Sequence, residues 1–216
     1  MRYITPFNIV LIILLPLLLF LLVSYFTVFD NSFYQEKFLE YNVDKNIPDA
    51  TQLHLKVVNF VQGKGTELPK QFNEREIQHL WDVRNIISKS KILLHAVLFS
   101  FILLLILSAY LLKSKNRFIK FLGSILFFGG LLTIIIAAFL FLFIKSNFSP
   151  TFEAFHMMLF KSGTYTFDPA TEMIVNLYPE ELFMDLGTRI SILVVIAAAI
   201  MALVGAVSIF KNKKNK

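Results

Sequence analysis

The sequence contains no cysteine, and this absence narrows its chemistry at once. Without cysteine the chain has no disulfide, no thiolate nucleophile and no cysteine metal ligand. Charged residues are also scarce, at 17% of the 216 residues, whereas 56% are hydrophobic and the mean hydropathy is +0.65. A soluble domain of this size carries more charge and fewer apolar side chains. The composition therefore predicts an all-α polytopic membrane protein.

Several motifs that define common enzyme and transporter classes are also missing. The sequence has no His-Glu-x-x-His metalloprotease helix, no glycine-rich phosphate-binding loop and no Gly-x-Ser-x-Gly nucleophile elbow. No apolar segment carries a row of charges, as the spans of a transporter or a proton pump do. A function must therefore come from residues outside these signatures.

Four apolar segments are long enough to cross a bilayer, which takes about 20 helical residues. The first segment is longer than the apolar core of a signal peptide and is followed by bulky residues instead of a cleavage site, so we expect a retained span. The predicted spans of this single membrane domain, residues 1–216, are residues 7–29, 92–112, 121–144 and 190–210.

Much of the net charge of +6 lies beside the spans, which argues against nucleic acid as a partner. The link 113–120 and the tail 211–216 contain only basic charges. Short basic segments stay in the cytoplasm. We therefore expect both termini and this link inside the cell, and segments 30–91 and 146–188, with short interfacial helices, outside it.

The first outer segment is predicted to contain two helices. Asp49, with Gln52 in the reciprocal position, is expected to cap the first, and Gly63 to end it. An apolar stripe within Leu53–Val61 suits packing onto a partner or the membrane interface. His54 flanks this stripe without a local partner, so we expect an exposed or boundary histidine.

The second helix of this segment is predicted to begin at Asn73, which forms a capping pair with Glu76. His79 and Asp82 follow three residues apart and share one helical face. There Asp82 can accept the proton of one ring nitrogen and leave the other nitrogen of His79 free as a base. An ordinary surface pair of histidine and aspartate is the alternative.

The distance of His79 from the second span adds a constraint. In a straight helix, His79 would stand about 20 Å from Ile92, because each residue rises about 1.5 Å. We expect that a lipid ester is out of reach from there. A role of His79 in lipid chemistry therefore predicts a break near Ser88–Lys91, with the helix lying along the membrane surface.

The second outer segment is predicted to start a helix at Ser149-Pro150. One face of this helix is rich in phenylalanine and comprises Phe152, Phe155, His156, Leu159 and Phe160. Such a histidine is either a core residue with a backbone partner or a base whose pKa is tuned by apolar walls. Further helices are expected to start at Asp168 and after Tyr178-Pro179.

Other residues in or beside the spans carry weaker signals. Arg189, at the start of the fourth span, either anchors to lipid phosphates or binds a polar or anionic group of a substrate. His95 is ionisable and lies one turn into the second span, so its role stays open. Gly123, Gly129 and Gly130 are assigned to helix packing.

Each outer segment contains one recognisable motif. The first is Arg75-Glu76-Ile77-Gln78-His79-Leu80-Trp81-Asp82-Val83-Arg84, which has the pattern Glu-x-x-His-x-x-Asp-Val. The second combines Phe155-His156-x-x-Leu159-Phe160 with Asp168-Pro169 and Leu177-Tyr178-Pro179-Glu180. Together with the four-span plan, these motifs resemble the lipoprotein intramolecular transacylases of Gram-positive bacteria over essentially the whole chain. The turn before Asp168 departs from the family, since it has Tyr165 and Phe167 where tryptophan is frequent.

The resemblance implies a membrane-lipid reaction on bacterial lipoproteins whose N-terminal cysteine carries diacylglycerol. The sn-2 acyl chain moves to the cysteine's own α-amino group and leaves an N-acyl, S-monoacylglyceryl lyso-lipoprotein. His79 and His156 are then the catalytic pair, one as base and the other acting on the oxyanion or the leaving oxygen, with either assignment open. Such a transfer needs no enzyme nucleophile, cofactor or metal. The supporting residues that we expect are Asp82, Arg84, Tyr178 and Arg189.

Two other functions stay open on the sequence. A zinc-dependent membrane hydrolase would use His79, Asp82 and His156 as ligands. A non-enzymatic membrane assembly or partner protein would expose the Leu53–Val61 stripe to another protein and tolerate the loss of both histidines.

Overall fold

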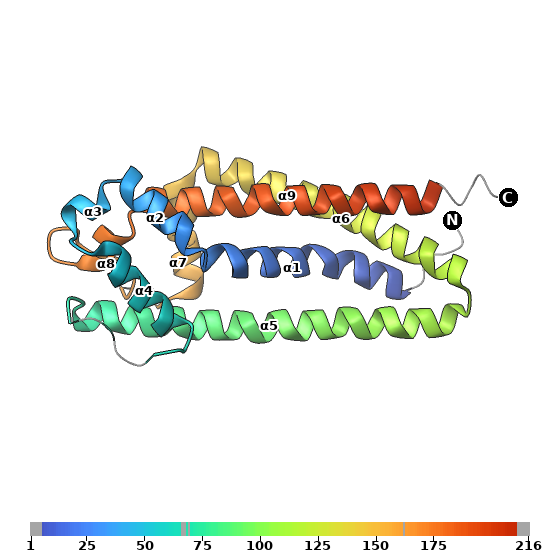
Figure 1. Ribbon diagram of the computed structural model, residues 1–216, viewed down its shortest axis with the longest axis horizontal. Coiled ribbons are helices and arrows are strands. Elements are labelled where there is room, and N and C mark those ends of the chain that lie inside the picture. Colours follow the sequence, from blue (N-terminus) through green and yellow to red (C-terminus); the bar gives the residue numbers. More distant parts are fainter. Residues whose placement is uncertain (1–5, 66–67, 69, 162, 211–216) are drawn as a thin grey trace. The chain divides into compact units, whose positions relative to one another are not determined.

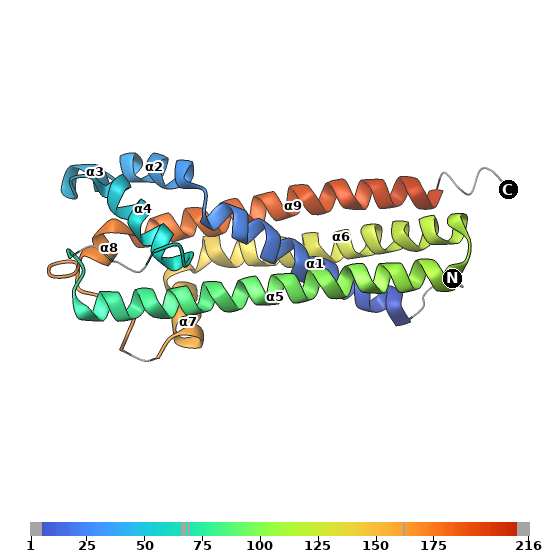
Figure 2. The ribbon, with the colours of Figure 1, turned by 60° about the horizontal axis from the view of Figure 1, so that its bottom comes forward.

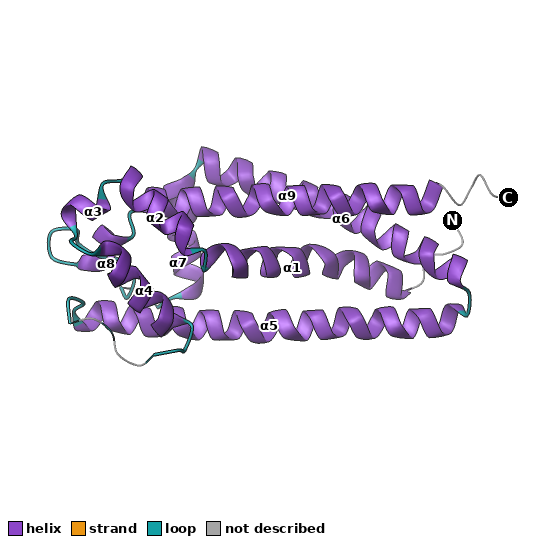
Figure 3. Ribbon diagram, in the orientation of Figure 1, coloured by secondary structure: helices purple, strands orange, loops and turns teal. Residues whose placement is uncertain are grey.

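The structure, a computed structural model, describes residues 6–65, 68, 70–161 and 163–210, so the predicted tail 211–216 lies outside the described residues. These residues form nine α-helices and no strand (Figure 3). The four long helices, each long and apolar enough to cross a membrane, are α1 (Pro6–Val28), α5 (Glu74–Leu112), α6 (Lys115–Ser146) and α9 (Glu180–Phe210). The short helices are α2 (Asn31–Glu40), α3 (Val43–Asn46), α4 (Ala50–Val61), α7 (Phe148–Leu159) and α8 (Met173–Leu177) (Figure 1). The predicted all-α fold with four candidate spans is confirmed.

The chain divides into two compact units. The membrane unit comprises Met1–Tyr25, Ile92–Leu142 and Thr188–Lys216. The inter-span unit comprises Phe26–Lys91 and Phe143–Gly187, and it contains both predicted outer segments almost entirely. The two candidate catalytic histidines therefore belong to the same unit.

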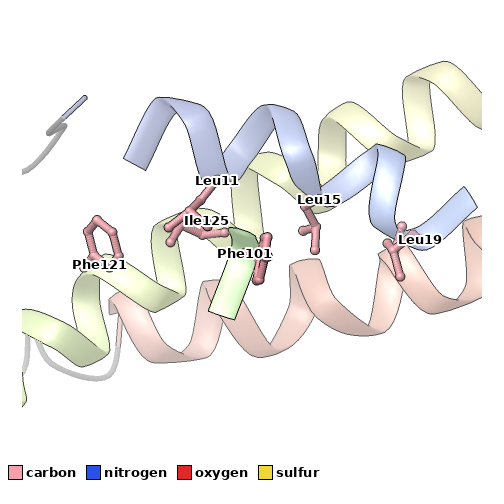
Figure 4. Packing of buried hydrophobic residues seen from close by; sticks show 7 residues of the cluster. Leu11, Leu15, Leu19, Phe101, Phe121 and Ile125 are labelled. Atoms are coloured by element: carbon pink, nitrogen blue, oxygen red, sulfur yellow. The ribbon is translucent and has the colours of Figure 1, made fainter. Parts of the chain in front are cut away.

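Aliphatic and aromatic side chains form the core of the membrane unit. The buried cluster consists of Leu11, Leu15, Leu19, Phe101, Phe121, Ile125 and Ala198 (Figure 4). Most other large apolar side chains on these helices are exposed, as expected where lipid is the solvent. Between helices in lipid, apolar burial supplies little driving force, so the closeness of packing decides the contact.

Glycines allow the closest of these contacts. A Cβ atom added at Gly205 would lie 2.5 Å from the backbone nitrogen of Phe127 and 2.6 Å from the carbonyl oxygen of Gly123. Added Cβ atoms at Gly129 and Gly130 would each meet an atom of a neighbouring helix at 2.8 Å. The predicted packing role of the glycines in the third span is therefore confirmed.

In the inter-span unit, α2, α3 and α4 pack on one another (Figure 2). The stripe of α4 within Leu53–Val61 is buried, so it is not exposed to another protein. Gly63, with φ of 81°, follows the helix as predicted. The helix begins directly after Asp49 as predicted, but the predicted side-chain cap is wrong: Asp49 adopts a left-handed φ of 61°, and its side chain makes no cap hydrogen bond. Aspartate tolerates that conformation better than most residues do.

Helix α5 runs without interruption from Glu74 to Leu112, so the predicted break near Ser88–Lys91 is wrong (Figure 1). The predicted break was argued from function, whereas these four residues include no proline or glycine that would interrupt helical hydrogen bonds. His79 and Ile92 therefore stand on one helix, about 20 Å apart along its axis.

The second predicted outer segment follows the sequence signals only in part. Helix α7 begins at Phe148, one residue before the predicted start, and α9 begins directly after Pro179 as expected. Asp168 does not start a helix. Its carboxylate accepts a hydrogen bond from the backbone nitrogen of Ala170 at 2.9 Å within a turn, and the next helix begins only at Met173.

Candidate active site

His79 of α5 and His156 of α7 lie beside each other in the inter-span unit. Their ring centroids are 6.4 Å apart, and the ring planes differ by 22°. The sequence placed the two histidines on separate predicted helices, and the structure brings them together. Two imidazoles at this separation can both contact the same reacting groups, such as an ester and the amine that attacks it.

Aromatic side chains surround the pair. The rings of four neighbours have centroids between 4.2 and 5.3 Å from His79 or His156, and they belong to Phe152, Phe160, Tyr165 and Phe167. Such rings supply large apolar contact areas. The expectation that a lipid ester could not reach His79 on an unbroken helix was based on the length of α5 alone. The aromatic rings place apolar surface beside His79 itself.

The hydrogen bond of His156 identifies its proton-accepting nitrogen. Nδ1 lies 2.7 Å from the carbonyl oxygen of Phe152, one helical turn earlier. A carbonyl oxygen only accepts, so Nδ1 of His156 donates and carries the proton. In the neutral ring Nε2 is then unprotonated and available as a base. The sequence left open whether His156 has a backbone partner or acts as a base. The structure shows that His156 can do both, because each role uses a different ring nitrogen.

His79 is more deeply enclosed, with 7% of its surface exposed. Burial, assisted by the proximity of His156, lowers the pKa of His79 to about 4, against smaller opposing effects of Asp82 and the Thr164 backbone. His79 is therefore neutral at neutral pH. Its Nδ1 is buried without a hydrogen-bond partner among the described residues. A buried polar atom of this kind is uncommon, because buried polar atoms usually have a hydrogen-bond partner.

The sequence predicted that Asp82 orients His79. In the part of the chain that the structure describes, no hydrogen bond joins these two side chains. The interaction that it does make with His79 is electrostatic, and it raises the pKa of the imidazole. An orienting role of Asp82 stays a prediction.

Arg84 and Arg189 lie in different surroundings from each other. The Arg84 guanidinium donates to the carbonyl oxygen of Gly65 at 3.1 Å and stacks within about 5 Å of the Phe60 and Trp81 rings. Arg189 and His95 belong to the membrane unit. Supporting roles of Arg84 and Arg189 therefore stay predictions.

The prediction that His54 is exposed or at a boundary is wrong. His54 is 2% exposed, its Nδ1 lies 3.0 Å from the Tyr178 hydroxyl, and the Tyr34 ring stacks on it at 4.1 Å. Burial lowers the pKa of His54 to about 4, and burial also raises the pKa of the Tyr178 hydroxyl. Tyr178 is 124 positions away along the chain, so no local sequence pattern could predict this pair.

Two buried glutamates connect the start of α5, which carries His79, to residues 168–174, and the sequence had assigned only one of them, as a helix cap. Glu76 and Asn73 form the predicted capping pair, with hydrogen bonds of 2.7 and 3.0 Å. The second carboxylate oxygen of Glu76 accepts from the backbone nitrogen of Ile174 at 2.6 Å, 98 positions away. The capping pair was readable because it is local, whereas the contact with Ile174 was not.

Glu172 makes the matching contacts from the other side. One carboxylate oxygen accepts from the backbone nitrogen of Asp168 at 2.7 Å. The other lies 3.3 Å from the Arg75 guanidinium and 3.3 Å from the side-chain amide nitrogen of Asn73. We call Glu76 and Glu172 the carboxylate clamp, because together they join residues 168–174 to the start of α5.

The described residues contain no group of three or more histidine, cysteine, aspartate or glutamate side chains placed to hold a metal ion. His79, Asp82 and His156 therefore do not form the ligand set that the zinc alternative requires. The burial of the α4 stripe likewise removes the surface that the partner-protein alternative required.

Comparison with solved structures shows a shared fold. The membrane-integral lipoprotein intramolecular transacylase Lit from Bacillus cereus superposes with a TM-score of 0.81 at 23% identity, covering 96% of each chain. Two variants of that protein, with a histidine replaced by arginine or by alanine, superpose with TM-scores of 0.78 at 22% identity. They cover 97% and 96% of this chain, and 93% and 94% of their own.

Comparison with sequences identifies the family. No curated protein sequence matches the chain. The family model described as lipoprotein intramolecular transacylase Lit matches residues 9–183, which is well over half of the chain. The chain, with its four candidate spans and its pair of adjoining histidines, therefore belongs to the lipoprotein intramolecular transacylase family.

Proposed function

We propose that this protein moves the sn-2 acyl chain of a diacylglyceryl-cysteine lipoprotein to the α-amino group of that cysteine. The observation that carries the proposal is the adjacency of His79 and His156 within an aromatic cluster. Family membership supplies the reaction class, a transacylation on a lipoprotein. The aromatic neighbours suit a substrate with acyl chains, because they offer apolar contact beside the reacting groups.

The reaction balances without an external reactant. The amine nitrogen attacks the ester carbonyl carbon and forms the new C–N bond, and the bond between that carbon and the glycerol oxygen breaks. The nitrogen loses one proton, and the glycerol oxygen gains one. Because amine and ester belong to one molecule, positioning them replaces an encounter between two molecules, and no enzyme nucleophile is needed.

We assign the base to His156 and the oxyanion donor to His79. The unprotonated Nε2 of His156 takes the amine proton and returns it to the glycerol oxygen. An α-amino group has a pKa of about 7.7–8.0, so a histidine can deprotonate it near neutral pH. His79, kept neutral by burial, offers an N–H to the oxyanion that forms at the ester carbonyl.

We propose that both termini lie in the cytoplasm, because the link 113–120 and the tail are basic and short basic segments stay inside the cell. The inter-span unit then faces the outside of the cell. Mature lipoproteins anchored in the outer leaflet would reach the two histidines from that side.

Tandem mass spectrometry of a lipoprotein's N-terminal peptide tests the proposal. In a strain that makes only the diacyl form, the protein is expected to produce an N-acyl, S-monoacyl peptide of unchanged total mass. The variants H79A and H156A should each lose about 100- to 10,000-fold in rate, the usual contribution of a positioned acid or base. H95A, in the membrane unit, is the matched control and should retain activity. An unchanged diacyl peptide despite normal expression of the protein would refute the proposal.

A further inference from the structure

We infer that Glu76 is a positioning residue for the transfer, which holds the segment 164–174 against the start of α5 so that Phe167 stays beside His79. The inference rests on the proposed function and adds a residue to which no role beyond helix capping has been assigned. Glu76 lies one turn before His79 on the same helix. Among the described residues, no hydrogen bond joins Glu76 to His79 or His156.

The contacts of Glu76 show that it joins two distant segments. Its side chain is almost completely buried, with 1% of the residue exposed. One carboxylate oxygen accepts from the backbone nitrogen of Asn73, and the other accepts from the backbone nitrogen of Ile174. A carboxylate offers two acceptor oxygens and no donor, which matches two backbone N–H groups. A simple helix cap would need only the first of these bonds.

Further bonds hold the same segment on both sides of Phe167. Arg75 donates to the carbonyl oxygen of Thr166 at 2.8 Å, and its guanidinium lies 5.7 Å from the centre of the Phe167 ring. Glu172 accepts from the backbone nitrogen of Asp168. Phe167 is thus fixed between Thr166 and Asp168, and its ring stands 5.3 Å from that of His79.

The clamp matters for the reaction because it determines what surrounds His79. His79 is only 7% exposed, and the Phe167 ring is one of the groups that cover it. If residues 164–174 loosen, water reaches His79, and the oxyanion donor loses its fixed position. A misplacement of about 1 Å by a mutation far from the chemistry can cost about 100-fold in rate.

The substitution E76Q tests this inference, with E74Q as the matched control. A glutamine keeps the size of the side chain but offers one acceptor oxygen, so one of the two backbone N–H groups loses its partner. Glu74 lies in the same first turn and is exposed, so E74Q makes the same change of charge outside the clamp. We expect E76Q to slow the transfer about 100-fold and E74Q to transfer at nearly the normal rate.

The second readout is the pKa of His79, which reports how closely the segment 164–174 covers His79 and which a loss of stability elsewhere in the chain would leave unchanged. The chain has four histidines, so selective labelling yields four imidazole signals for NMR titration, and H79Q assigns the relevant one. In E76Q the pKa of His79 should rise from about 4 toward its ordinary value of 6.5, because water enters. In E74Q it should stay at about 4.

Each outcome decides the inference. Normal transfer by folded E76Q, or slow transfer with an unchanged pKa of His79, would overturn it. If E76Q does not fold, E172Q loosens the same segment through the bond to Asp168 and must give the same two changes. Should the wild-type protein make no N-acyl peptide while the pKa of His79 still rises in E76Q, the proposed function fails and the positioning of His79 by Glu76 stands.

Discussion

The membrane unit and the inter-span unit bury different kinds of groups. In the membrane unit the buried cluster consists of aliphatic side chains and two phenylalanines, and backbones approach closely at glycines such as Gly205. In the inter-span unit, buried positions include the imidazoles of His54 and His79 and the carboxylates of Glu76 and Glu172. Outside this cluster, most large apolar side chains of the membrane unit are exposed, whereas aromatic side chains of the inter-span unit lie beside the buried imidazoles.

The difference reflects what surrounds each unit. A helix in lipid gains little from burying leucine against leucine, so shape and small residues decide which helices pack. Segments between spans must bury apolar groups away from water, and each polar group buried with them needs a partner. We therefore expect the stability of the inter-span unit to depend on pH and on its hydrogen bonds. The stability of the membrane unit should depend on the volume of the side chains at its helix contacts.

The largest expected effect concerns pH. His54 and His79 have pKa values of about 4 in the folded protein and about 6.5 when unfolded. Between these values the unfolded chain binds more protons, so stability is complete above pH 6.5 and falls as the pH drops toward 4. The loss amounts to about 3 kcal/mol for each histidine at pH 4. Thermal unfolding in detergent from pH 7.5 to pH 4 would measure it.

The substitution H54Q separates the two histidines in that experiment. Glutamine has no group that titrates in this range, so the variant should lose only about half as much stability as the wild-type protein on acidification. An equally steep loss in H54Q would mean that burial of His54 does not contribute to the acid sensitivity of the inter-span unit.

An intermediate effect is expected from G205A in the membrane unit. The added Cβ would lie 2.5 Å from a backbone nitrogen, which cannot move aside as a flexible side chain can. Overpacking of this kind costs about 1–3 kcal/mol. G65A, where an added Cβ meets no atom within 4 Å, is the control and should unfold at nearly the normal temperature. Equal melting temperatures for the two variants would show that close packing at Gly205 is not important.

The smallest expected change in stability concerns two carboxylates that form ion pairs with the same lysine. Lys37 lies 2.6 Å from both Asp185 and Glu40, whose side chains are 20% and 50% exposed. Asp185 also accepts from the Tyr41 hydroxyl at 2.8 Å. We expect D185N to cost about 1 kcal/mol and E40Q only a few tenths, because exposed ion pairs contribute little. Denaturation curves showing the reverse order would contradict this dependence on burial.

The parts predicted correctly from the sequence depend on residues close together in the chain. The first span was expected at residues 7–29 and is Pro6–Val28, and the capping pair of Asn73 and Glu76 is present. The break at Ser88–Lys91 was wrong because it was argued from what a lipid substrate would require. The local residues there favour a continuous helix, and the structure follows them.

By itself, the amino-acid sequence determined the four candidate spans and the two motifs that carry the histidines. Hydrophobic length, flanking charge and capping are local properties, and a chain displays them before it folds. Only the tertiary structure decided that His79 and His156 adjoin, that His54 pairs with Tyr178, and that Glu76 reaches Ile174. These contacts join residues roughly a hundred positions apart, and their energy depends on burial that exists only once the segments have packed together.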